Sequence, residues 1–134
     1  MGDIIKNFPV QSIAEIEVKL RVYFDSGSPF TFIKKQASME LQSPVLQLKR
    51  EFGGMGDGKF HASGLMEIVV KLLDIWCPQT AYVVEDETLD EGYEILAGHD
   101  FTQRYDIKLD SQKRDIIVDK AALIRAQKIR NCGK

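Results

Sequence analysis

The sequence predicts an all-β domain with one or two short helices. Residues 16–24 alternate apolar and polar or aromatic side chains with a period of two, which is the pattern of a half-buried strand. Further short apolar runs follow along the chain, each bounded by turn-forming residues. Four of the ten glycines fall within residues 53–58. Short strands joined by tight turns are therefore expected, with few helical segments between them.

Length and composition fit one globular domain spanning residues 1–134, with a core at about 4–118 and a helical tail at about 119–134. Hydrophobic residues make up 44% and charged residues 28% of the 134 residues, and the net charge is -2. A nucleic-acid partner is not expected, because such proteins usually carry a basic face. Cys77 and Cys132 form no metal-binding spacing, so we predict neither a metal nor another cofactor.

The N-terminal residues lack a basic flank followed by a long apolar run, so no signal peptide is predicted. No stretch approaches the roughly 18 apolar residues that a membrane span requires. We therefore expect no membrane partner and an intracellular, cytoplasmic location. Release of this chain from a longer polyprotein is compatible with the same features.

The first part of the chain contains two predicted strands. Residues 4–10 form the first, and Pro9 places it at an edge because proline cannot donate to a neighbouring strand. Residues 16–24 form the second, which leads into a turn-rich loop at residues 25–29. For residues 33–42 the sequence leaves two possibilities open: a short helix, or a further strand and loop.

The middle of the chain predicts a long hairpin. Residues 47–52 and 59–73 form its two strands, and Asp57-Gly58 suits a tight turn in which the central residues need positive φ. Residues 80–84 form another strand. The acidic stretch at residues 85–94 is interpreted as a solvated loop.

The last part predicts a short buried strand at residues 93–97 and a helical turn at residues 101–104. A final hairpin pairs residues 105–109 with residues 116–118. Asp119 is then expected to cap a basic helix from Lys120 to about Arg130, because its carboxylate can accept from the free N–H groups of the first turn. The helix should end near Asn131 or Gly133.

The strongest chemical feature lies where the second strand ends. In Val22–Ser28 a carboxylate, Asp25, stands directly after an apolar strand and is followed by small residues. Burial raises the pKa of a carboxyl group, while hydrogen bonds to its ionised form lower it. The Gly27 N–H and the Ser28 hydroxyl are placed to make such bonds.

The segment Arg21–Ile33 resembles the active-site segment of retropepsins and retrotransposon proteases. A second block, Glu94–Phe101, is similar to the second signature of that family and contains Leu96, Ala97 and Gly98. A Gly-rich hairpin, residues 52–64, lies between the blocks where the family carries its flap. The resemblance covers about residues 16–118, and the tail from Asp119 has no clear counterpart in it.

This resemblance implies a retropepsin-like closed β-barrel with a flap hairpin, active as a homodimer. The implied activity is that of an aspartic endopeptidase acting on an extended peptide, with one Asp25 from each subunit as the catalytic pair. Ser26 would hydrogen-bond across the dimer, Gly27 would contact the substrate backbone, and Ser28 would stabilise the ionised carboxylate. The flap would comprise Gly53, Gly54, Met55, Gly56, Asp57 and Gly58.

One alternative from a different functional class stays open at this point. A chain with this fold would also serve as a non-catalytic dimerisation or peptide-binding module, because fold alone does not fix function. The intact Asp25 favours the catalytic interpretation. Phe30 and Phe32 are expected in the core, with pocket lining as their other possible role.

Overall fold

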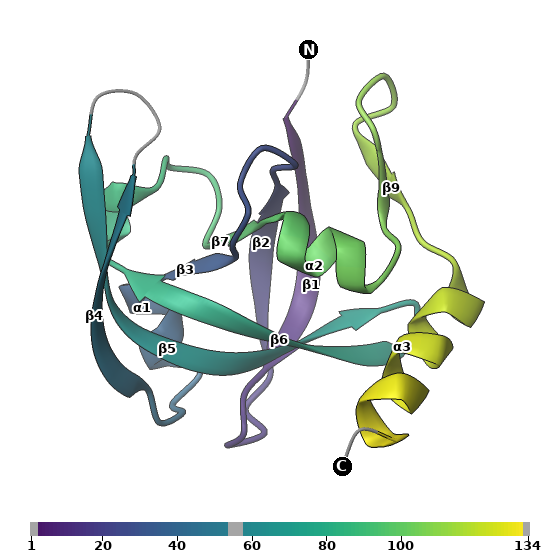
Figure 1. Ribbon diagram of the computed structural model, residues 1–134, viewed down its shortest axis with the longest axis horizontal. Coiled ribbons are helices and arrows are strands. Elements are labelled where there is room, and N and C mark those ends of the chain that lie inside the picture. Colours follow the sequence, from purple (N-terminus) through teal and green to yellow (C-terminus); the bar gives the residue numbers. More distant parts are fainter. Residues whose placement is uncertain (1–2, 54–57, 133–134) are drawn as a thin grey trace.

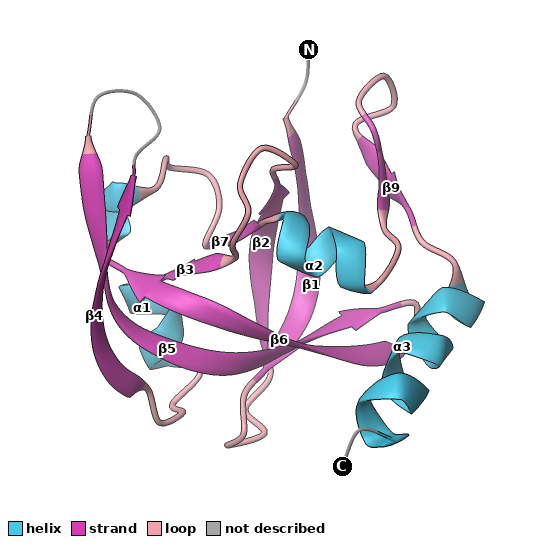
Figure 2. Cartoon of the chain, in the orientation of Figure 1, coloured by secondary structure: helices cyan, strands magenta, loops and turns pink. Residues whose placement is uncertain are grey.

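The computed structural model describes residues 3–53 and 58–132, which form a closed, strongly curved sheet (Figures 1 and 2). The sheet has seven strands in the order β1-β2-β7-β3-β6-β5-β4, and a further pairing of β1 with β5 closes it into a barrel, leaving β4 outside the ring. The strands are β1 (Ile4–Gln11), β2 (Val18–Phe24), β3 (Phe32–Lys34), β4 (Leu46–Gly53), β5 (Lys59–Leu72), β6 (Ile75–Val84) and β7 (Ile95–Ala97).

The helices are short and lie around the barrel (Figure 2). They are α1 (Lys35–Glu40), the 3-10 turn η1 (Asp86–Thr88), α2 (His99–Arg104) and α3 (Lys120–Cys132). A separate two-stranded sheet pairs β8 (Lys108–Asp110) with β9 (Asp115–Ile117). No helix in the described part of the chain is long and apolar enough to cross a membrane.

The alternating pattern of the second strand is confirmed. Leu20, Val22 and Phe24 are buried, while the residues between them are exposed or half-buried. β1 pairs with β2 along Ile4–Val10 but with β5 only at Val10 and Gln11. Pro9 therefore has a sheet neighbour on one side only, as an edge position requires.

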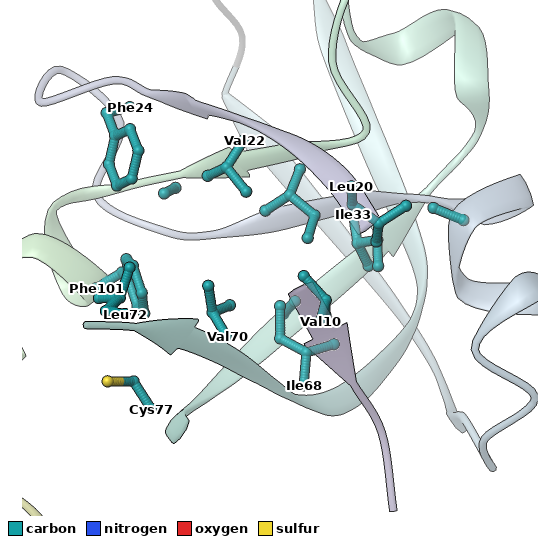
Figure 3. Packing of buried hydrophobic residues seen from close by; sticks show 14 of the residues in the cluster. Val10, Leu20, Val22, Phe24, Ile33, Ile68, Val70, Leu72, Cys77 and Phe101 are labelled. Atoms are coloured by element: carbon teal, nitrogen blue, oxygen red, sulfur yellow. The ribbon is translucent and has the colours of Figure 1, made fainter. Parts of the chain in front are cut away.

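The main core consists mostly of aliphatic side chains from several strands, and Phe101 of α2 packs among them (Figure 3). Ile33, Ile68 and Val10 are almost completely buried. Cys77 also lies in this core, and burial raises the pKa of its thiol to about 12. That thiol is therefore uncharged and inert at neutral pH.

Residues 33–42 contain both a strand and a short helix, since β3 is followed directly by α1. It also corrects two boundaries. β6 begins at Ile75 rather than at residue 80, because Leu73 and Asp74 turn the chain with positive φ and join β5 to β6 in one hairpin. The last hairpin pairs 108–110 with 115–117, so its strands are shorter than predicted.

The predicted cap of the C-terminal helix is confirmed. The Ala121 N–H donates to the Asp119 carboxylate at 3.1 Å, which satisfies one of the free donors in the first turn of α3. Leu123 on this helix is fully buried and joins the main core. The tail is thus packed against the barrel through α3.

Candidate active site

Asp25 follows β2 directly and is held over the end of β7. β2 runs parallel to β7 with Phe24 opposite Ala97, and the Asp25 N–H continues this pairing by donating to the Ala97 carbonyl at 3.0 Å. β7 also pairs antiparallel with β3, so it lies between β2 and β3. The loop at residues 25–31 must therefore pass over the end of β7, which presents Asp25 half-buried and Ser26 and Gly27 exposed.

The loop holds the Asp25 carboxylate partly as predicted. The Gly27 N–H donates to Asp25 Oδ1 at 2.9 Å, which is the predicted hydrogen bond. The Ser28 prediction needs a correction, because the Ser28 hydroxyl donates to the Phe30 carbonyl at 2.8 Å. A hydroxyl has one hydrogen, so in this chain Ser28 stabilises the turn of the loop rather than the carboxylate.

The second signature forms the floor beneath this loop. A Cβ on Gly98 would lie 2.2 Å from the Phe30 carbonyl oxygen and 2.7 Å from the Ser28 oxygen. The His99 N–H donates to the same Ser28 carbonyl at 2.6 Å. Only glycine leaves room for this approach, so the two sequence blocks predicted to act together are in contact.

A hydrogen-bonded network locks the loop to α2. The hydroxyl of Thr31, which is 1% exposed, donates to Asp100 Oδ1 at 2.7 Å and accepts from the Gly98 N–H at 3.2 Å. The Thr31 N–H and the Gln79 side-chain amide donate to Asp100 Oδ2 at 3.2 and 2.9 Å. The sequence pattern assigns no role to Thr31 or Gln79, although Thr31 lies within the segment Arg21–Ile33 that resembles the active-site segment of retropepsins.

β2 is also tied to the segment that enters β7. The Arg21 N–H donates to Glu94 Oε1 at 2.7 Å, and the Arg21 guanidinium forms a salt bridge with the same carboxylate. Burial raises the pKa of Glu94, but the hydrogen bonds and charge of Arg21 outweigh it and hold the pKa below its ordinary value. This pairing fixes the register of the two strands that carry the predicted signatures.

An aromatic groove adjoins the Asp25 loop. It encloses about 330 Å³ and joins the loop to the base of the predicted flap hairpin. Its lining comprises Gly27, Ser28, Pro29, Phe30, Phe32, Phe52, Gly53 and Phe60. Phe32 is 4% exposed and Phe30 half-buried, so each serves the core cluster and the groove together.

Only the two ends of the predicted flap lie within the described part of the chain. Gly53 ends β4 and Gly58 precedes β5, and neither has an atom within 4 Å of where a Cβ would stand. Gly54, Met55, Gly56 and Asp57 lie outside the described residues. The arms of the hairpin, β4 and β5, pair antiparallel up to Gly53 and Lys59.

Comparison with solved structures decides the fold. The retroviral protease-like domain of Ddi1 from Leishmania major matches with a TM-score of 0.59 and 18% identity, over 85% of this chain and 87% of that one. The EIAV protease complexed with the inhibitor HBY-793 matches with a TM-score of 0.57 and 17% identity, over 78% and 91%. The fold is retropepsin-like. No family model and no curated protein matches the sequence.

Two tyrosines of this retropepsin-like fold lie close enough to Asp25 to respond to its charge. Tyr23 and Tyr93 have ring centroids 4.9 Å apart. Burial raises the pKa of both phenols, and the nearby Asp25 charge raises it further. Both phenols therefore stay neutral at neutral pH.

Within residues 3–53 and 58–132, no group of three or more His, Cys, Asp or Glu side chains is arranged to hold a metal ion. Asp25 accepts a hydrogen bond from Gly27, and Gly27 lines the groove.

Proposed function

We propose that this chain is one subunit of a homodimeric aspartic endopeptidase. The observation that carries the proposal is the position of Asp25. In a retropepsin-like fold, it follows β2 on an exposed loop and accepts a backbone hydrogen bond from Gly27, which lines the aromatic groove. The sequence contains Asp-Ser-Gly once, so a second catalytic carboxylate would come from a second copy.

The proposed chemistry follows from bringing the two carboxylates together. At a separation of about 3 Å they share one proton, since two like charges that close are unfavourable. The ionised Asp25 takes a proton from a bound water, which attacks the scissile carbonyl carbon, while the protonated Asp25 donates to the carbonyl oxygen. Collapse of the resulting diol breaks the C–N bond, and a proton passes to the leaving nitrogen.

The rest of the site would position an extended peptide. Groove residues such as Phe30 and Phe52 would receive apolar side chains beside the scissile bond. The exposed Gly27 would lie against the peptide backbone. The hairpin of β4 and β5 would close over the peptide and exclude water, as lids do in many enzymes.

The test is cleavage of a peptide library by the wild type and by Asp25→Asn, between about pH 4 and pH 7. We expect cleavage by the wild type alone, falling steeply when the protein is diluted below its dimer dissociation constant. Cleavage by Asp25→Asn would refute the assignment. A stable wild-type dimer without any cleavage would instead favour a peptide-binding or dimerisation module.

A further inference from the structure

Arg50 of β4 stands over the wall of the aromatic groove. Its guanidinium carbon lies 4.9 Å from the ring centre of Phe30, 4.8 Å from that of Phe52 and 5.1 Å from that of Tyr82. Phe30 and Phe52 line the groove themselves. A peptide side chain that contacts these two rings would therefore come within reach of Arg50.

The positive charge of Arg50 has no carboxylate partner among residues 3–53 and 58–127. One of its N–H groups donates to the Tyr82 hydroxyl, a neutral acceptor. The side chain is exposed, so water reaches its other donors. When the faces of a guanidinium pack on aromatic rings, the N–H groups at its edge stay free to donate. Two of these N–H groups point in parallel and match the two oxygens of a carboxylate.

Three aromatic contacts also hold the Arg50 guanidinium in one position. An exposed arginine ordinarily loses conformational freedom when it binds an anion, and that loss weakens surface ion pairs. Here the rings and the Tyr82 hydroxyl already hold the guanidinium in place. A carboxylate that approaches through the groove would meet a positioned donor pair.

We propose that Arg50 is a specificity-determining residue that selects peptides carrying an Asp or Glu side chain next to the residue held in the aromatic groove. This inference rests on the proposed function, because it assigns a substrate preference to the same site. The ligand class is an acidic extended peptide. Charge-assisted hydrogen bonds at such an exposed position predict a preference of about five- to ten-fold for Glu over Gln at one peptide position.

The test compares peptides that differ only by Glu or Gln at each position in turn. Wild type, Arg50→Met and Arg50→Glu would be assayed for the ratio of kcat/KM between the two peptides at about pH 6, where Glu is ionised. Arg50→Met keeps an apolar stem for the rings, and its ratio should fall to about one. Arg50→Glu should reverse the ratio. Lys49→Met removes a charge from the same strand, from a side chain that contacts no ring in the described part of the chain, so its ratio should stay at the wild-type value.

A second readout does not depend on catalysis. The same peptide set would be captured by Asp25→Asn protein, with and without Arg50→Met, and the retained Glu and Gln peptides counted by mass spectrometry. If Glu peptides are enriched and Arg50→Met abolishes that enrichment, the inference about Arg50 is supported. A failure of the wild type to cleave any peptide would then count against the proposed function and not against the role of Arg50. Equal retention of both peptides, or a Glu preference that survives Arg50→Met, overturns it.

Discussion

At the scale of single residues, the glycine of the second signature is required because there is no room for a side chain, and not because of its backbone conformation. Gly98 has φ -91°, which any residue adopts, yet an added Cβ would stand 2.2 Å from the Phe30 carbonyl oxygen. The obstructing atoms belong to the backbone of the Asp25 loop and cannot rotate away. The glycine therefore sets how closely the loop and β7 approach.

We predict that Gly98→Ala destabilises the protein by more than about 3 kcal/mol, the upper end for overpacking, because the whole loop must shift. Urea unfolding at fixed subunit concentration measures this change. Gly53→Ala is the matched control, since its Cβ would meet nothing within 4 Å, and its effect should stay within about 0.5 kcal/mol. Equal effects of the two substitutions would contradict the argument.

At the scale of elements, the sequence predicted the strands and helix caps that depend only on neighbouring residues. The alternation in β2, the apolar run of β7 and the Asp119 cap of α3 are each visible within a few residues. The β5–β6 turn was missed because Leu73-Asp74 carries no glycine or asparagine, although both residues adopt positive φ. Here the long pairing of β5 with β6 overrides the local preference of the turn.

The link between the Asp25 loop and α2 also escaped prediction, since Thr31 and Asp100 are far apart in sequence. We predict that Thr31→Val lowers the free energy of unfolding by about 1–3 kcal/mol, because it leaves buried polar groups without their partner. Thr80→Val on β6 makes the same chemical change at a more exposed hydrogen bond and should cost under about 0.5 kcal/mol. Thermal unfolding of the two variants compares these effects, and a Thr31→Val protein as stable as wild type would show that the network does not hold the loop.

At the scale of the whole molecule, the two sequence blocks predicted the fold and their own contact, because the barrel brings the ends of β2 and β7 together. They did not predict the aromatic groove. That groove combines residues from the Asp25 loop, β3, β4 and β5, which are separated in the sequence and come together only in the folded sheet. The ring contacts of Arg50 were hidden from the sequence for the same reason.

The last prediction concerns the assembly that the proposed chemistry requires. If each active site needs one Asp25 from each of two copies, a mixed dimer of wild-type and Asp25→Asn subunits has a single carboxylate and should be inactive. When equal amounts of the two proteins exchange subunits freely, about a quarter of the dimers contain two intact subunits. Activity should therefore fall to about a quarter of that of the same total amount of wild type, and not to half.

Native mass spectrometry of a mass-tagged Asp25→Asn chain checks that exchange is complete before activity is measured. Varying the fraction of wild type then separates the two possibilities, since a shared site gives activity proportional to the square of that fraction and a self-sufficient chain gives direct proportion. A linear response with complete exchange would mean that one barrel carries the whole reaction. Asp25 would then need a different proton donor, and the groove beside it would be the place to look for one.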